Sequence, residues 1–313
     1  MIFMCSGQGS QYYQMGRELF LRYPDFRRCM QEMDRVVLEL SGTSVLGALY
    51  DPSRRKSDLF DSICITSPAI FMLEFALASL LIEGGTVPDR ILGSSMGVYA
   101  AAAIAGCMDR DEALRIIVTQ ARIFERQCPP GGMISVLGDP ALVAGAVRSG
   151  HCEIAAVNLP NHFTLAAPEA QLAGIESLIA DERVSFQRIA VRHAFHSRWI
   201  DAANQPLEAF LRTLKLRSPH IPIVCCAGAR TLRELPQTYF WSVAREPIRF
   251  YDTMQQLERE GPFRYVDVGP AGSLATLVKY ALGPGSKSSV HAALSPYSSD
   301  WQTFQSLQGS LRV

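Results

Sequence analysis

The chain lacks the charge bias and the cysteine spacing that would suit it to nucleic acid or to a metal ion. Its 313 residues carry 30 basic and 30 acidic side chains, so the formal net charge is zero and no basic excess attracts nucleic acid or an anionic membrane. The eight cysteines contain no C-x-x-C pair, and several lie inside apolar runs, as reduced thiols of a cytoplasmic protein do. We therefore expect a cytoplasmic protein without nucleic-acid partners.

The sequence also has no apolar run of the kind that spans a bilayer. Residues 69–82 are apolar but too few to cross a membrane, and they contain Glu74, so they predict a buried helix. Met1–Cys5 lacks a basic flank and predicts a strand instead of a signal peptide. Repeats and low-complexity segments are absent as well. We expect a monomer without membrane association, and the 48% of hydrophobic residues suffices for a large core.

The most informative feature that is present is Gly93-Ser94-Ser95-Met96-Gly97, a G-x-S-x-G pattern. A short run, Asp89-Arg90-Ile91-Leu92, precedes it and predicts a strand, and a small-residue helix pattern over 98–105 follows. In this strand–turn–helix context the flanking glycines allow a sharp turn that exposes one serine hydroxyl at a helix N-terminus. Ser95 is therefore the candidate nucleophile.

A serine nucleophile needs a base, and six histidines are available. His193 and His196 follow the apolar run 189–191, so a strand end could deliver either imidazole to Ser95. A metal site at this pair is disfavoured, because no Cys, Asp or Glu is suitably spaced near it. The residues alone leave open which of the two is the base. The remaining histidines fit solvated or capping positions better: His151, His162, His220 and His291.

The order of expected elements changes after residue 128. Cys128-Pro129-Pro130-Gly131-Gly132 breaks the preceding helix. From there to residue 192 the pattern is βαββαβ, which is typical of a ferredoxin-like unit. Its expected elements are strands 133–137, 152–157, 162–166 and 184–191 and helices 140–149 and 169–181. Ser95 and His196 flank this insert, so the sequence predicts a site in the cleft between two subdomains.

Outside the insert, the pattern predicts a larger α/β unit. It continues after the insert with alternating helices and strands. The expected helices and strands that position the site are helix 13–21, helix 199–214, strand 221–227, helix 250–260, strand 265–268 and helix 273–282.

Four motifs in one order resemble the malonyl-CoA:acyl-carrier-protein transacylases and the acyltransferase domains of polyketide synthases. They are Gly7-Gln8-Gly9-Ser10-Gln11, the Ser95 pattern, Ala194-Phe195-His196-Ser197 and Val268-Gly269-Pro270. The resemblance covers essentially the whole chain. It implies an α/β fold with an α/β-hydrolase-like catalytic subdomain (1–128 and 193–313) and a ferredoxin-like insert (129–192).

The resemblance also implies roles for individual residues. Ser95 would attack a thioester with His196 as its base, and the backbone N–H groups of Gln8 and Met96 would form the oxyanion hole. A main-chain carbonyl would orient the histidine, and the matching position falls near Arg249. No metal or dissociable cofactor is implied, because the substrate is carried on the phosphopantetheine arm of a carrier protein.

Departures from the family pattern bear on the acyl group. Relatives that use malonyl groups hold the malonyl carboxylate with an arginine at the position of Gln120. The helical period places Gln120 on the apolar face of a helix that Asp109 caps, and it places Arg122 on the polar face. The elbow has Ser94 where the family usually has histidine. With Phe195, Gln120 and Ser94 form the expected substrate-binding set.

An uncharged pocket suits acetyl, propionyl or butyryl groups better than malonyl. The chain looks most like the acyl hydrolases of trans-acyltransferase polyketide assembly lines, which implies an editing thioesterase that clears acyl groups from carrier proteins. Two alternatives remain: an acyltransferase that loads a neutral or malonyl unit, and an inactive module that binds carrier proteins. Arg54-Arg55-Lys56 could meet an acidic carrier helix or simply be a solvated loop.

Overall fold

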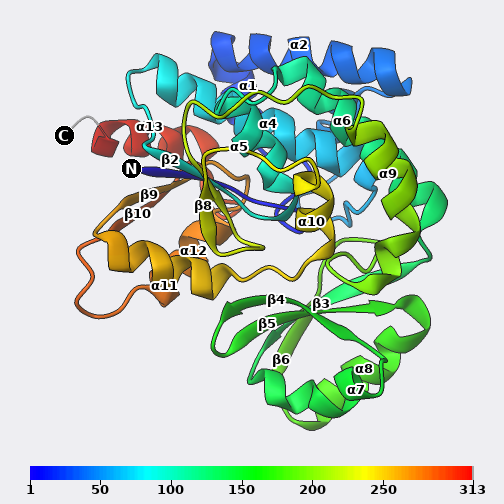
Figure 1. The fold of residues 1–313 in the computed structure, drawn as a ribbon. Helices are drawn as coiled ribbons and strands as arrows, with labels where there is room; N and C mark the ends of the chain where they lie inside the picture. The colour runs from blue at the N-terminus through cyan, green and yellow to red at the C-terminus, as the bar shows by residue number, and fades with distance from the viewer. Residues whose placement is uncertain (312–313) are drawn as a thin grey trace.

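The computed structural model describes residues 1–311 and divides the chain between two sheets (Figure 1). The larger sheet has six strands in the order β10-β9-β1-β2-β7-β8. All neighbours are parallel except β7 and β8, which are antiparallel. Its strands are β1 (Ile2–Cys5), β2 (Arg90–Gly93), β7 (Ile223–Cys225), β8 (Arg230–Leu232), β9 (Arg264–Asp267) and β10 (Ser289–Ala292).

Both faces of the large sheet are covered, as a parallel sheet requires. Along β1, Phe3 and Cys5 face one apolar cluster while Ile2 and Met4 face another. The second face carries α11 (Phe250–Glu260) and α12 (Ser273–Ala281), which Figure 1 shows below the strands. The helices whose buried residues join the first cluster are α1 (Arg17–Arg22), α2 (Pro24–Ser41), α3 (Val45–Leu49), α4 (Ile63–Glu83), α5 (Val98–Ile104), α6 (Arg110–Gln127), α9 (Asn204–Leu211), α10 (Tyr239–Arg245) and α13 (Asp300–Leu311).

The helix α4 contains the apolar run that the sequence predicts as a buried helix. Among residues 1–311 it alone has the length and hydropathy to cross a membrane, and 78% of its apolar window is buried inside the protein. Glu74 in its middle is fully buried. The prediction of a buried core helix is confirmed, but the expectation that the apolar segment is too short to cross a membrane is wrong, because the helix begins at Ile63 and has 21 residues.

The second sheet belongs to the insert and has the strand order β4-β5-β3-β6 with antiparallel neighbours. This is the arrangement that the βαββαβ order predicts. Its helix α8 (Glu169–Asp181) has the predicted bounds, whereas residues 140–148 form a 3₁₀ turn followed by a short helix. The insert consists of β3 (Gly131–Leu137), α7 (Ala144–Arg148), β4 (Glu153–Leu159), β5 (His162–Pro168), α8 and β6 (Ser185–Arg188).

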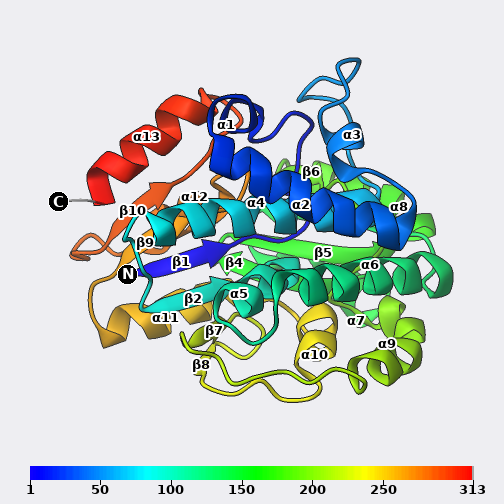
Figure 2. The same ribbon diagram turned by 90° about the horizontal axis from the view of Figure 1, so that it is seen from above.

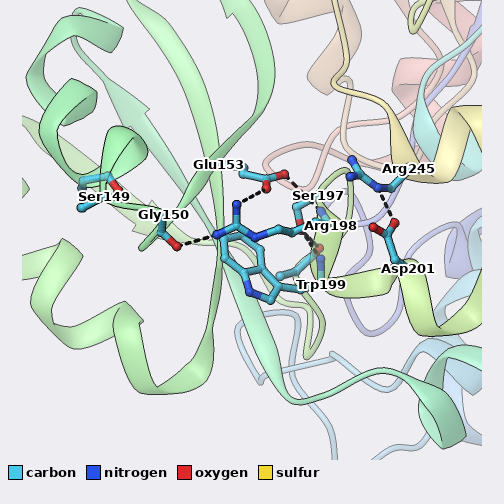
Figure 3. A network of polar contacts seen from close by, with 10 residues as sticks. Ser149, Gly150, Glu153, Ser197, Arg198, Trp199, Asp201 and Arg245 are labelled. Atoms are coloured by element: carbon cyan, nitrogen blue, oxygen red, sulfur yellow. Dashed lines mark hydrogen bonds and ion pairs between the residues drawn. The ribbon is translucent and has the colours of Figure 1, made fainter.

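A polar network joins the insert to the large subdomain (Figure 3). The Arg198 guanidinium lies 3.1 Å from the Glu153 carboxylate, donates to the Gly150 carbonyl at 2.7 Å, and stacks on Trp199. Figure 2, seen from above, shows the insert elements β4 and β5 beneath the large sheet. The two subdomains are therefore joined by polar contacts from Arg198 to Glu153 and Gly150.

Candidate active site

The turn after β2 holds Ser95 in a backbone conformation that few non-glycine residues adopt. Ser95 has φ +53°, in the left-handed region, and a 3₁₀ turn (Ser95–Gly97) leads directly into α5. A Cβ at Gly97 would lie 2.2 Å from the Cys5 carbonyl oxygen, and one at Gly93 would lie 2.6 Å from the Val98 Cα. Both glycines are thus needed for close backbone packing, and this is the strand–turn–helix arrangement that the sequence predicts.

The base that lies against Ser95 is His196. The Ser95 Oγ is 2.7 Å from His196 Nε2, and His196 is 2% exposed. His193 lies instead on the Glu125 side, with its Nε2 3.9 Å from that carboxylate. The residues alone left open which histidine is the base. The distances place His196, and not His193, against Ser95.

The carbonyl that orients His196 belongs to Glu246, so the expectation for Arg249 is wrong. His196 Nδ1 lies 3.0 Å from the Glu246 oxygen, at the C-terminal end of α10. The Arg249 carbonyl instead accepts from Thr253 N at 3.0 Å and Thr253 Oγ1 at 2.7 Å, because Arg249 caps the start of α11. A carbonyl committed to the first turn of a helix is not available to the imidazole.

Burial sets the protonation state of His196. Desolvation lowers the pKa of this histidine to about 4, although the backbone carbonyls around it favour the charged form. A neutral imidazole whose Nδ1 faces a carbonyl must carry its proton on Nδ1. Nε2 is then the free acceptor, as a base for the Ser95 hydroxyl requires.

We expect kcat/KM for reaction of Ser95 with an acyl donor to keep its plateau well below pH 6.5 and to fall as the pH drops through about 4. The neutral base is the active form, and its lowered pKa moves the loss of activity toward acid. A pH–rate series with far-UV circular dichroism at each point would measure this. Half-loss near pH 6.5 with the fold intact would contradict the buried, neutral histidine.

The turn after β1 lies directly against the Ser95 elbow. A Cβ on Gly7 would be 2.7 Å from Ser95 Cβ and 3.3 Å from Met96 N, so the Gly7–Gln8 peptide borders the serine. The Gln8 side chain is held by α4, since its Nε2 donates to Ser67 Oγ at 2.8 Å and its Oε1 accepts from Thr66. The Gly7–Gln8 peptide and the Met96 nitrogen thus lie beside Ser95, where the family resemblance places the oxyanion hole.

Behind Ser95 lies a small, mainly apolar cavity of about 30 Å³. That is space for about two water molecules, which fits the closed end of a pocket for a short acyl chain. Apolar contributions come from Phe124, Phe195 and Phe240. None of the cavity-lining residues is an arginine or lysine.

Gln120 lines this cavity, as the helical period predicts. It is 9% exposed, and its Oε1 accepts a hydrogen bond from the buried Tyr99 hydroxyl. Tyr99 stacks on Phe240 with the rings 4.7 Å apart. Arg122 is exposed and donates to the Leu40 carbonyl at 2.8 Å, so it does not serve the pocket. Tyr99 escaped the sequence analysis, although it follows Ser95 by one helical turn.

Replacing Tyr99 with Phe should lower the free energy of unfolding by about 1–3 kcal/mol, because the buried Gln120 oxygen loses its donor. Urea denaturation would measure this. The control is Tyr280→Phe on the exposed face of α12, where Tyr280 is 76% exposed and no change is expected. Equal stability of Tyr99→Phe and the parent protein would contradict the contact.

In front of Ser95, a cleft of about 900 Å³ opens between the subdomains. Ser94 borders this cleft and not the small cavity, whereas Phe195 borders both. The insert contributes polar side chains from its sheet, including Ser135 and His162, whose Oγ and Nε2 are 2.8 Å apart. The cleft between the two parts that the sequence predicts is therefore present.

Comparisons with known proteins agree with this architecture. Residues 2–311 match the family described as "Acyl transferase domain". The chain is 37% identical to the polyketide biosynthesis acyltransferase homolog BaeD of Bacillus velezensis, covering 99% of this chain and 96% of that protein. It is 35% identical to the homolog PksD of Bacillus subtilis, with 98% and 95% covered.

Solved structures share the fold. The acyl transferase domain of SpnD, solved with 2-(pent-4-yn-1-yl)malonyl, superposes with a TM-score of 0.88 at 27% identity over 99% of this chain and 75% of that one. A loading acyltransferase of the avermectin modular polyketide synthase superposes with a TM-score of 0.90 at 23% identity, covering 100% and 99%. These likenesses cover both subdomains.

Proposed function

The chain belongs to the acyl transferase domain family, and from that membership we propose that it removes short uncharged acyl groups from acyl-carrier-protein thioesters in polyketide biosynthesis. The observation that carries the proposal is the small cavity behind Ser95, which Gln120 lines without any cation. A malonyl carboxylate placed there has no positive partner, and an unpaired buried charge costs about 3–5 kcal/mol. An acetyl group carries no such cost.

In the first half-reaction, the Ser95 oxygen attacks the thioester carbon while His196 Nε2 takes the hydroxyl proton. The N–H groups of Gln8 and Met96 stabilise the negative oxygen of the tetrahedral intermediate. When the carbon–sulfur bond breaks, His196 returns its proton to the departing sulfur. The products are acyl-Ser95 and the free thiol of the carrier.

In the second half-reaction, water enters from the open cleft. His196 Nε2 takes a proton from this water as its oxygen attacks the acyl-Ser95 carbonyl. Collapse of the second tetrahedral intermediate breaks the bond to Ser95 Oγ, which regains its proton from His196. The products are a free carboxylic acid and the regenerated serine, and no cofactor is consumed.

The second candidate is transfer of the acyl group to another thiol. The names of the relatives favour it, since BaeD and PksD are both described as acyltransferase homologs. The same residues would serve, because a thiol replaces water as the second nucleophile. The two functions differ only in what discharges acyl-Ser95.

Incubation with acetyl- and malonyl-carrier protein, followed by intact mass spectrometry, tests the proposal. We expect conversion of the acetyl carrier to the free thiol without any acceptor, while the malonyl carrier stays unchanged. An acetyl-Ser95 adduct that discharges only after a second carrier thiol is added would establish transfer instead. Rapid malonyl loading would overturn the assignment of the Gln120 pocket.

A further inference from the structure

Three side chains form a continuous hydrogen-bonded chain beneath the Gly7–Gln8 turn. Ser10 Oγ donates to the Gly7 carbonyl at 2.7 Å, and Ser6 Oγ lies 3.0 Å from Ser10 Oγ. The Ser6 hydroxyl and the Ser6 N–H lie 2.8 and 2.6 Å from Glu74 Oε1. All three side chains are buried, and Glu74 is fully so. The reaction steps above use none of them.

The contact between Ser10 and the Gly7 carbonyl shows how these three side chains could affect the active site. The Gly7 carbonyl and the Gln8 N–H belong to one planar trans peptide, so they point in opposite directions. A hydroxyl that fixes the carbonyl therefore also fixes the direction of the N–H. Because Gly7 lies against Ser95 and Met96 N, a rotation of this peptide would turn the Gln8 N–H away from the oxyanion that it is proposed to stabilise.

The proton count along the chain favours a neutral Glu74. Ser10 uses its only proton on the Gly7 carbonyl. If Glu74 is protonated on Oε1, it donates to Ser6 Oγ, Ser6 donates to Ser10, and each hydroxyl has both a donor and an acceptor. Full burial and the nearby Asp267 raise the pKa of Glu74 well above its usual range. Hydrogen bonds aligned in one direction also strengthen one another.

The Val268-Gly269-Pro270 segment packs against the hydrogen-bonded side chains at Ser6. A Cβ on Gly269 would lie 2.3 Å from Ser6 Oγ, so only glycine leaves room for the Ser6 hydroxyl. The Tyr12 hydroxyl also donates to the Pro270 carbonyl at 3.1 Å. This segment therefore packs closely against the Ser6 hydroxyl.

We propose that Ser10 is a positioning residue that aims the Gln8 N–H at the oxyanion, with Ser6 and Glu74 holding the Ser10 hydroxyl in place. The inference rests on the proposed function, because it takes the Gln8 N–H as an oxyanion donor. Ser10 itself touches no reacting atom. Its contribution is to the tetrahedral intermediate and not to the binding of the ground state.

The test compares Ser10→Ala with Thr253→Val in the full chain, using acetyl-carrier protein. Thr253 is a matched control, because it is also buried and also donates a hydroxyl to a backbone carbonyl, but on α11. We expect Ser10→Ala to lower kcat about 10- to 100-fold with KM changed less than about 2-fold. Ser10→Thr, which keeps the hydroxyl, should recover most of this loss, and Thr253→Val should show no such loss of kcat.

Unchanged kcat in folded Ser10→Ala, or an equal loss in Thr253→Val, would overturn the inference. Glu74→Gln gives a second, independent check, since an amide oxygen accepts from Ser6 but cannot also donate to it. We expect a smaller fall in kcat, and the double variant with Ser10→Ala should fall no further than Ser10→Ala alone. If the falls in kcat of the two single variants multiply in the double variant, Ser10 and Glu74 do not act through one hydrogen-bonded network. Failure of the parent protein to cleave acetyl-carrier protein would instead count against the proposed function.

Discussion

Replacement of Ser95 by Ala should abolish turnover of acetyl-carrier protein, with a loss of about 10⁴-fold or more. Without the Ser95 Oγ no acyl-enzyme can form, and the residual rate comes only from binding and the oxyanion donors. Intact mass spectrometry after incubation with the acetyl carrier should show no +acetyl species in this variant. The carrier should remain acetylated at times when the parent protein has converted it fully.

The fold should tolerate this change, since only one oxygen is removed at the edge of an open cleft. A suitable control is Ser177→Ala on the exposed surface of α8, for which we expect parental turnover. Substantial turnover by Ser95→Ala, or an acyl adduct on another residue, would remove Ser95 from the mechanism. Thermal unfolding of both variants would show whether either change alters stability.

Replacement of Gln120 by Arg should shift the acyl preference toward malonyl by about a hundredfold or more. The guanidinium would supply the cation that the cavity lining lacks, and pairing a buried carboxylate is worth about 3–5 kcal/mol. The measurement is the ratio of malonyl to acetyl loading of Ser95 in single-turnover experiments. Both carriers should be tested at equal concentration.

Gln120→Met is the matched control, because it keeps similar length without adding charge. It should leave malonyl loading as low as in the parent protein. If Gln120→Arg folds and its acyl preference is unchanged, the cavity behind Ser95 is not the acyl pocket. Loss of the Tyr99 hydrogen bond should lower stability in both variants alike, so it does not affect the comparison.

The helix bounds that depend on residues adjacent in sequence were predicted correctly. The predicted helices 169–181 and 250–260 have the observed bounds of α8 and α11. Asp109 caps α6 by accepting from Glu112 N at 2.7 Å, and that start fixes the helical phase that turns Gln120 inward. Such features need only neighbours along the chain.

Features that depend on distant parts of the chain were missed or misplaced. The helix predicted over 13–21 begins at Arg17, because Gln14 and Gly16 both have φ +69° and Gln14 is bound to the loop carbonyl of Asp51. The helix predicted over 199–214 is a 3₁₀ turn (Arg198–Ala203) followed by α9. Strands β8 and β10 and helix α10 were not predicted.

The backbone carbonyl that contacts His196 could not be predicted from the sequence, for a different reason. Every residue carries a backbone carbonyl, so composition cannot mark the one that contacts an imidazole. What distinguishes Glu246 from Arg249 is that the first ends α10 and the second begins α11. That difference requires the helix boundaries, and local sequence signals predicted those of α11 but not those of α10.

All residues that line the small cavity come from the large subdomain, as do Ser95, His196 and the Glu246 carbonyl. The insert contributes only to the walls of the wider cleft. The small cavity is therefore formed by the large subdomain alone, whereas the wider cleft in front of it is formed by both subdomains. Under the proposed function, an exchange of residues 129–192 with those of a relative should leave the range of acyl groups unchanged, because it alters only part of the cleft wall.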